Sequence, residues 1–263
     1  MAKLCVCLET VFRDLPFLER IDRIANLGYE VMEFWSLDPN DPGRKPRAIA
    51  KRCEARGITI SDFVVSSPDG GIGGSLVKPE DRAAYLSNLK ATVRLAQELN
   101  CGKLITCTGN AVAGRSREEQ VESIKATLKE AAEIAGEASI TLVLEPLNTR
   151  VDHVGYFLDS PYEAAAIVRE VNHPAVRLLY DCYHMQIMAG NLIDTITQNI
   201  DIIGHFHSAG VPGRHELDEG EINYPAIIKK IDELGYQGYF GLEYYPTLPS
   251  EESLARMRRL LAP

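Results

Sequence analysis

Residues 142–148 read Leu142-Val143-Leu144-Glu145-Pro146-Leu147-Asn148, an apolar run that ends on a carboxylate and a proline. A short apolar run bounded by a turn signal is typical of a strand buried on both faces, as in a parallel sheet. The same pattern returns three times further along the chain, where the apolar runs end at Asp181, His207 and Glu243. This recurring pattern is the main evidence for both the fold and the chemistry.

Outward from this stretch, strand-like runs alternate with amphipathic helical stretches along the whole chain. Ser116 with Glu119 forms a capping-box pattern, Ser160-Pro161 marks a helix start, and Gly235 marks a helix end. Eight strands are predicted, at Leu4–Glu9, Val31–Trp35, Thr59–Ser66, Lys103–Gly109, Thr141–Leu147, Val176–Asp181, Ile203–Ala209 and Tyr239–Tyr245. The helices predicted most clearly between them are Pro79–Asn100, Ser116–Gly136 and Tyr224–Leu234.

Strict alternation of strands and helices predicts parallel strands that are covered by helices. Eight such units close into a (β/α)₈ TIM barrel, an α/β fold of about this length. An open doubly wound sheet is the alternative. No linker or break in composition divides the chain, so residues 1–263 are expected to form a single TIM-barrel domain.

Composition excludes several classes of protein. The chain carries 28 basic and 37 acidic side chains, a net charge of −9, which argues against a nucleic-acid binder with a basic surface. No apolar run approaches the ~20 residues needed to cross a bilayer, so no membrane partner is expected. The N-terminus does not resemble a signal peptide, and the 6 cysteines form no C-x-x-C pair. These features predict a reduced, cytoplasmic protein.

The four strand-end residues point to a metal site. Carboxyl ends of barrel strands converge on one mouth, where Glu145, Asp181, His207 and Glu243 would surround one point. Three carboxylates that share a site repel one another unless a cation lies between them. Oxygen-rich ligation with one nitrogen favours Mn²⁺, Mg²⁺ or Co²⁺ over structural zinc.

Each of these residues alone has a simpler explanation. A carboxylate at a strand end is commonly a helix cap or a solvated loop charge, and a strand histidine is commonly a satisfied core group. The second explanation is adopted for His205, which lies two residues before His207 on the same predicted strand and therefore further from the barrel mouth. Trp35 is compatible with the core or with a pocket wall, and Gly70–Gly74 is interpreted as a mobile loop over the mouth. The four residues together, one on each of four consecutive strands, favour the shared metal.

Four stretches resemble the hydroxypyruvate isomerase family, within the wider xylose isomerase-like barrels. They are Glu145-Pro146-Leu147-Asn148, the run from Tyr180 to Gln186, and Gly220-Glu221-Ile222-Asn223-Tyr224, with Glu243-Tyr244 at the last strand. The resemblance implies a (β/α)₈ barrel, metal ligands at Glu145, Asp181, His207 and Glu243, and an acid/base pair formed by Glu145 and Glu243. It departs from the family at His207, where glutamine is frequent, and in the loop Gly213–Gly220.

The expected reaction is a metal-dependent isomerisation of a small hydroxy-ketone and hydroxy-aldehyde, hydroxypyruvate and tartronate semialdehyde or a close analogue. Proton transfer between neighbouring carbons through an enediolate needs a base, an acid and a divalent cation. His184 is a candidate to hold a substrate oxygen, and Arg214 is a candidate clamp for a substrate carboxylate. The partner is therefore a small hydroxy-carbonyl or sugar-acid substrate, and a homo-oligomer is left open.

Four other functions are weighed against this one. A 2-oxo-tetronate isomerase would use the same chemistry on a longer acid. A ketose 3-epimerase would resemble it too, but those enzymes carry a Glu where this chain has Val151. A phosphodiesterase like endonuclease IV would need several strand-end histidines and a basic groove. A non-catalytic sugar-binding barrel would leave two carboxylates without a role.

Overall fold

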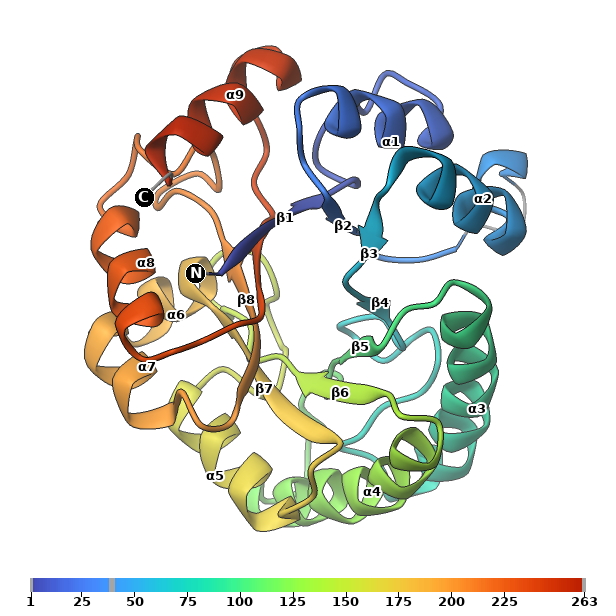
Figure 1. Ribbon diagram of the computed structural model, residues 1–263. Coiled ribbons are helices and arrows are strands. Elements are labelled where there is room, and N and C mark those ends of the chain that lie inside the picture. Colours follow the sequence, from blue (N-terminus) through green and yellow to red (C-terminus); the bar gives the residue numbers. More distant parts are fainter. Residues whose placement is uncertain (1, 38–40, 262–263) are drawn as a thin grey trace.

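The computed structural model describes residues 2–37 and 41–261. Its strands form one curled parallel sheet, and helices surround the strands (Figure 1). The strands are β1 (Lys3–Cys7), β2 (Val31–Glu33), β3 (Thr59–Ile60), β4 (Phe63–Val64), β5 (Lys103–Thr106), β6 (Thr141–Leu144), β7 (Val176–Asp181), β8 (Ile203–Ser208) and β9 (Tyr239–Leu242). The α-helices are α1 (Phe17–Asn26), α2 (Pro46–Arg56), α3 (Arg82–Glu98), α4 (Arg117–Glu137), α5 (Pro161–Val171), α6 (Cys182–Met188), α7 (Leu192–Asn199), α8 (Tyr224–Glu233) and α9 (Ser250–Leu260), with 3₁₀ turns at Pro42–Arg44 and Pro79–Asp81.

The sheet closes as a barrel because the first and last strands pair. The strand order is β3-β2-β1-β9-β8-β7-β6-β5-β4, and every pair is parallel. Cys5 of β1 lies in register with Gly241 of β9. The predicted (β/α)₈ barrel is confirmed, and the open doubly wound sheet is excluded.

The third predicted strand, Thr59–Ser66, is not continuous. It is divided into β3 and β4, and the ladder is interrupted at Ser61 and Asp62 between them. Both halves stay attached to the neighbouring strand segment, because Ser61 N donates to Met32 O (2.8 Å) and Val64 N donates to Trp35 O (3.0 Å). The ring is therefore complete at this point, but its ladder is irregular.

The helix signals of the sequence act as expected. Ser116 and Glu119 form a complete capping box at the start of α4, and Ser160 caps α5 through Glu163 N. Helix α8 ends at Glu233, and Gly235 takes a positive φ of 78° just beyond it. The stretch predicted as one helix from Pro79 begins as a 3₁₀ turn and continues as α3.

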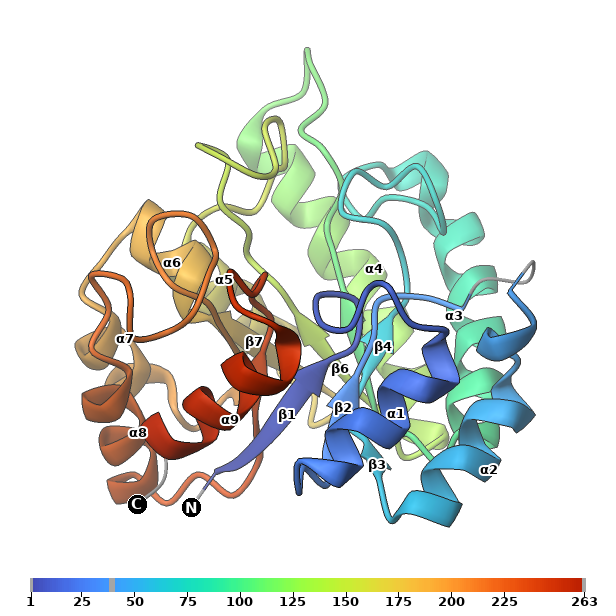
Figure 2. The ribbon, with the colours of Figure 1, turned by 90° about the horizontal axis from the view of Figure 1, so that it is seen from above.

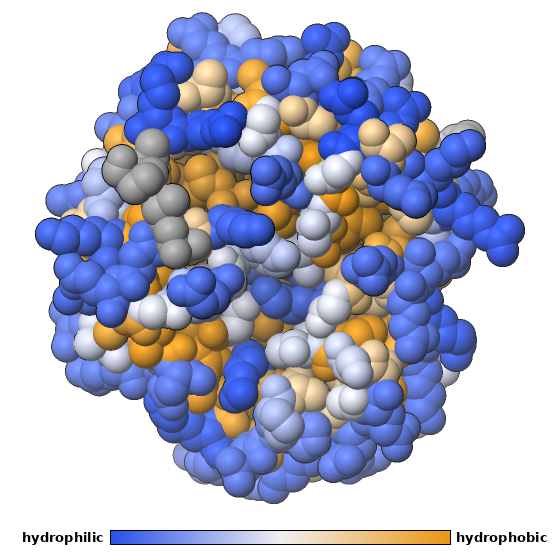
Figure 3. All heavy atoms as spheres, in the orientation of Figure 1, coloured by the Kyte–Doolittle hydropathy of each residue, from blue (hydrophilic) through white to orange (hydrophobic). Residues whose placement is uncertain are grey.

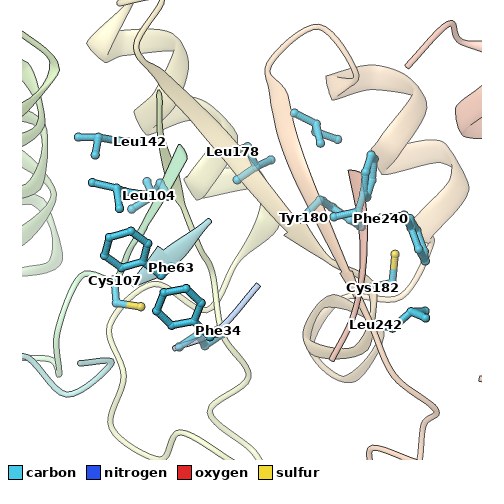
Figure 4. Packing of buried hydrophobic residues seen from close by; sticks show 14 of the residues in the cluster. Phe34, Phe63, Leu104, Cys107, Leu142, Leu178, Tyr180, Cys182, Phe240 and Leu242 are labelled. Atoms are coloured by element: carbon cyan, nitrogen blue, oxygen red, sulfur yellow. The ribbon is translucent and has the colours of Figure 1, made fainter. Parts of the chain in front are cut away.

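Side chains of the strands alternate between an outer and an inner layer. Outward residues such as Leu104, Leu142 and Leu178 belong to the large core between strands and helices, where Phe34 stacks on Phe63 at 5.2 Å (Figure 4). Inside the barrel, Ile105, Val143 and Leu179 form a separate small apolar cluster. The rest of the inner layer is more polar. It includes Glu33, Asp62, His205 and His207, and the candidate site lies at its end.

The two ends of the barrel differ. Figure 2 shows the loops that follow the strands on its upper side, while the chain termini lie on the lower side. Figure 3 views the end with the termini, where hydrophilic side chains surround scattered apolar ones. In the described part of the chain, no helix is both long and apolar enough to cross a membrane.

Candidate metal centre and active site

The barrel brings the four strand-end residues together at its mouth. Glu145 directly follows β6, Asp181 is the last residue of β7, His207 lies near the end of β8, and Glu243 directly follows β9. These strands are consecutive neighbours in the sheet. One ligand atom from each of the four residues lies within 4.8 Å of the others, and all four side chains are buried. The four side chains are therefore close enough to hold one ion between them.

His207 forms the centre of this cluster. Its Nδ1 lies 3.2 Å from Glu145 Oε1 and 3.4 Å from Glu243 Oε2. Asp181 caps α6, since its Oδ1 accepts the backbone N–H groups of Tyr183 (2.7 Å) and His184 (3.2 Å). The cap fixes the Asp181 carboxylate at the mouth and leaves Oδ2 for another partner.

The carboxylates of the cluster outnumber the positively charged groups beside them, and the pKa values of the buried groups reflect this imbalance. Burial raises the pKa of the Asp181 carboxyl to about 7. Burial also raises the pKa of Glu145, although His207 opposes the shift. For His207 burial acts to lower the pKa, but the carboxylates of Glu33 and Glu243 prevail and hold it well above its usual value. A buried site that retains protons on a carboxyl group and on an imidazole is one where a cation can replace them.

Glu243 is the carboxylate held most firmly in the ionised form. Burial would raise its pKa, but Arg214 and His207 outweigh burial and keep the pKa below its usual value. Arg214 Nη2 lies 2.5 Å from Glu243 Oε2, and Trp35 Nε1 donates to Glu243 Oε1 at 2.6 Å. Glu243 is thus oriented from two sides.

The donor set fits a divalent cation. Three carboxylates and one imidazole nitrogen offer mostly oxygen ligands, which suits Mn²⁺, Mg²⁺ or Co²⁺. The retained protons and the close approach of the donor atoms agree with this interpretation.

A cavity of about 470 Å³ opens above the cluster. Its polar wall includes Glu145, His184, His207, Arg214 and Glu243. Its other wall is mainly apolar and includes Val64, Val65, Ile72, Ile105 and Leu147. Ile72 belongs to the loop Gly70–Gly74, so this loop borders the cavity; its mobility stays a prediction.

His184 lies buried in the cavity wall with one nitrogen unpaired. Its Nδ1 is 3.2 Å from the backbone N–H of Asn148, which can only donate, so the proton of the neutral ring is assigned to Nε2. Within residues 2–37 and 41–261, His184 Nε2 has no hydrogen-bond partner, and Asp181 Oδ2 lies 3.5 Å away. Burial lowers the pKa of His184 well below its usual value. The ring therefore offers a neutral N–H donor to the cavity.

Arg214 reaches inward from the loop after β8. Its guanidinium lies over the Tyr183 ring, 5.3 Å from the centroid, and the side chain is only 12% exposed. Its backbone has a positive φ of 60°, unusual for a residue with a Cβ. In this structure Arg214 is paired with Glu243, so a substrate carboxylate would have to share it or replace that partner.

Sequence reasoning missed two residues below the cluster, and left one above it undecided. Both are buried: Glu33 contacts His205 and His207, and Asp62 contacts His205. A charged residue inside the apolar run Val31–Trp35 is the signal that could have pointed to Glu33. Trp35 proves to be a pocket wall residue that also orients Glu243. His205 is fully buried and hydrogen-bonded, which confirms its assignment to the interior.

Comparison with known proteins adds independent evidence. Residues 21–260 match the model of a family described as xylose isomerase-like TIM barrel. The chain is 32% identical to a putative hydroxypyruvate isomerase of Homo sapiens, over 95% of this chain and 92% of the relative. It is 30% identical to a 2-oxo-tetronate isomerase of Cupriavidus necator, over 99% of each chain.

Two solved structures place the fold in the same group. The crystal structure of an AP endonuclease, family 2, from Brucella melitensis is 32% identical, with a TM-score of 0.88 over 98% of this chain and 99% of that one. An L-ribulose 3-epimerase is 22% identical, with a TM-score of 0.77 over 98% and 86% of the two chains. The second likeness concerns the fold alone.

Proposed function

This chain belongs to the xylose isomerase-like TIM barrel family and, within it, to the hydroxypyruvate isomerases, and from that premise we propose the reaction that it catalyses. It is an isomerase. The proposed reaction is a divalent-metal-dependent interconversion of a small hydroxy-ketone and hydroxy-aldehyde. Hydroxypyruvate and tartronate semialdehyde, or a close analogue, are the proposed substrate pair.

One observation carries this proposal. Glu145 and Glu243, which follow the first and last of four consecutive strands, both lie close to the same nitrogen of His207, at 3.2 and 3.4 Å. A substrate bound above His207 would therefore meet one carboxylate at each of two neighbouring carbons. One glutamate takes the proton and the other returns it, which is the arrangement that a 1,2-proton transfer needs.

The residues that would hold the ion are Glu145, Asp181, His207 and Glu243. A bound divalent ion supplies positive charge that stabilises the developing enediolate. The chain itself holds Asp181 by the N-terminus of α6 and orients Glu243 by Trp35 and Arg214. These fixed positions reduce the rearrangement required when the reaction begins.

Two cavity residues are proposed to bind the substrate. His184 offers its unpaired Nε2–H to a substrate oxygen. Arg214, at the edge of the cavity, offers the planar fork that a carboxylate accepts. A substrate with an acid group next to the reacting carbonyl would meet both, which favours a hydroxy-keto acid over a neutral ketose.

A 2-oxo-tetronate isomerase is the second candidate. The relative with that name matches 99% of its own length, and the cavity of about 470 Å³ has room for a fourth carbon. A ketose 3-epimerase is less favoured, because this chain lacks the additional glutamate expected of those enzymes. Its place is taken by Val151, which is 63% exposed.

The Brucella structure named as an AP endonuclease makes DNA cleavage a necessary control. The net charge of −9 and the small carboxylate-lined cavity disfavour a DNA substrate, whose phosphates call for a basic surface.

A substrate screen tests the proposed function. Protein loaded with Mn²⁺ is incubated in D₂O with hydroxypyruvate, 2-oxo-tetronate or D-fructose, and proton NMR follows isomerisation and deuterium uptake. We expect turnover of at least one keto acid and little turnover of the neutral ketose. Cleavage of DNA with abasic sites, without turnover of either acid, would contradict the proposal.

A further inference from the structure

A row of polar side chains lies inside the barrel, below the proposed metal ligands. Glu33 comes from β2, Asp62 from the segment between β3 and β4, and His205 from β8, and all three are buried. Lys103, at the start of β5, stands at the lower end of the row. The proposed reaction uses none of these residues.

The contacts in the row have a fixed direction. An ammonium group can only donate, so Lys103 Nζ, 3.4 Å from His205 Nδ1, makes that nitrogen the acceptor. The proton of neutral His205 is then on Nε2, which lies 2.9 Å from Glu33 Oε2 and 3.3 Å from Asp62 Oδ2. One oxygen of Glu33 is thereby engaged from below.

The other oxygen of Glu33 faces His207. Glu33 Oε1 lies 3.3 Å from His207 Nε2, close enough for an ion pair, and neither atom has a hydrogen-bond partner in the described part of the chain. An ionised carboxylate can only accept, so this neighbour favours a proton on Nε2. Glu145 and Glu243 face His207 Nδ1 in the same way, so without a cation this nitrogen is protonated too. When a cation replaces that proton, the Nε2–H form leaves the lone pair of Nδ1 free to bind the cation.

Gly241 makes room for this approach. A Cβ at Gly241 would lie 2.7 Å from His207 Cδ2 and 2.8 Å from Glu33 Oε1. Both distances are too short for a real contact, so any larger residue would push the two side chains apart. The space between Glu33 and His207 is therefore kept open by a third strand, β9.

We propose that Glu33 is a positioning residue that holds His207 in the Nε2–H form and so presents Nδ1 as a ligand to the metal ion. The proposal rests on the metal site of the proposed function. A partner on the second nitrogen of a metal-binding histidine fixes both the tautomer and the ring orientation. Glu33 is itself held by His205, so the row acts on the ion only through His207.

The same residues could instead hold a second ion. Glu33, Asp62, His205 and His207 each offer a ligand atom within 4.8 Å of the others. The ammonium of Lys103 already supplies positive charge there, next to His205. We therefore favour one ion per chain, and the stoichiometry of binding distinguishes the two arrangements.

The first experiment measures Mn²⁺ binding by calorimetry on purified protein and on two variants. Glu33→Gln keeps the shape but gives the side chain an NH₂ group, which can donate to His207 Nε2 and favour the wrong tautomer. Asp62→Asn is the matched control, because the Asp62 carboxylate pairs with His205, whereas the Glu33 carboxylate also reaches His207. We expect Glu33→Gln to weaken binding roughly 10- to 100-fold and Asp62→Asn to change it less than about threefold.

These measurements separate positioning from folding. The metal-free melting temperatures of the wild type and the Glu33→Gln variant are expected to agree, because a structural role alone would lower the second. Wild-type Mn²⁺ affinity in Glu33→Gln, an equal loss in Asp62→Asn, or two ions per chain would overturn the proposal. A wild-type protein that binds no ion would overturn the metal site as well.

A second experiment needs no substitution at Glu33. Protein with ¹⁵N-labelled histidine is loaded with Zn²⁺, a diamagnetic probe, and two-bond ¹⁵N–¹H spectra report the tautomer of each ring. His207 is identified by the loss of its signals in His207→Gln. We expect a proton on Nε2 and the metal on Nδ1. The reverse assignment would overturn the proposal, whatever the variants show.

Discussion

At the scale of single residues, Glu243 combines two roles that a conservative substitution can separate. Glutamine keeps an oxygen donor and can still accept from Trp35, but it cannot take a proton. We expect Glu243→Gln to lower kcat by about 10² or more, the usual contribution of a general base, while some Mn²⁺ stays bound. Single-turnover kinetics with calorimetry measure both quantities. The Asp181→Ala control should lose metal and activity together, and wild-type turnover in Glu243→Gln would mean that Glu243 is only structural.

Arg214 is expected to act on the substrate acid group and on Glu243. Loss of a charge-assisted hydrogen bond costs about 2 to 3 kcal/mol, so Arg214→Met should lower kcat/KM for a keto acid by roughly 100-fold. The loss should be much smaller for a neutral ketose. Because Arg214 lowers the pKa of Glu243, its removal should also move the acidic limb of the pH profile to higher pH.

The matched variant for this prediction is Arg214→Lys, which keeps the charge without the planar fork. It should restore the pH profile more than it restores kcat/KM for the acid. Equal losses on the acid and on the neutral substrate would instead assign Arg214 to shaping the loop.

Residues of the cluster could be predicted because they repeat a rule that the sequence shows directly. Each ends an apolar run, and strand ends of a barrel meet at one mouth. Glu33 and Asp62 could not be found in this way. Their role depends on which side of β2, and of the segment between β3 and β4, faces the interior of the barrel. Only the closed ring decides that, since it places both against His205 from the opposite strands.

At the scale of elements, Glu216 fastens the loop after β8 to the start of α9. Its carboxylate is fully buried and accepts from Thr247 N, Leu248 N, and the hydroxyls of Thr247 and Ser253. Glu216→Ala would leave these donors unpaired, so we expect a loss of about 3 kcal/mol in the free energy of unfolding. Glu216→Gln should lose less, because it keeps the shape. Urea unfolding measures both, and equal stability of Glu216→Ala and wild type would contradict the prediction.

The pH dependence of this loss has a definite sign. Burial would raise the pKa of Glu216, but the hydrogen bonds from Ser253 and Thr247 prevail and lower it. A carboxyl group with a lowered folded-state pKa stabilises the protein above its unfolded-state pKa and loses this effect as the pH falls. The difference between wild type and Glu216→Gln should therefore shrink towards acid pH.

Most elements could be predicted from periodicity and caps, but the third strand could not. Its sequence has an unbroken strand pattern, while the structure interrupts the strand at Ser61 and Asp62. The buried carboxylate of Asp62 contacts His205 at this break, and such a tertiary contact leaves no mark on local periodicity. The strand Val176–Asp181 was predicted with its observed bounds, but the other strands were predicted to end one to three residues too late, because the polar mouth, not propensity, ends each of those ladders.

At the scale of the whole molecule, metal and protons should compete. Burial raises the pKa of Asp181 to about 7, above its unfolded-state value of about 3.9. The folded metal-free protein therefore binds more protons than the unfolded chain between these values, and the contribution of Asp181 to stability falls as the pH rises. A bound ion removes this penalty. We expect the rise in Tm on adding Mn²⁺ to be larger at pH 8 than at pH 6.

Scanning calorimetry at the two pH values, with and without EDTA, checks this expectation. Binding should also release protons at pH 6, which calorimetry in buffers of different ionisation enthalpy can count. The same rise at both pH values would argue against protons on the ligands, and full activity after removal of all metal would contradict the site.

The pairing of β1 with β9 brings the first and last strands together, and the chain ends lie away from the mouth (Figure 2). The chain could therefore be circularly permuted without changing which strands are neighbours in the barrel. A glycine-rich linker could join the ends, and new ends could be cut at exposed Gly102, where a Cβ would meet nothing within 4 Å. In such a chain all four ligand strands would leave the ribosome before β1. The ion could then serve as a nucleus for the other half, whereas in the natural order the ligands are made last.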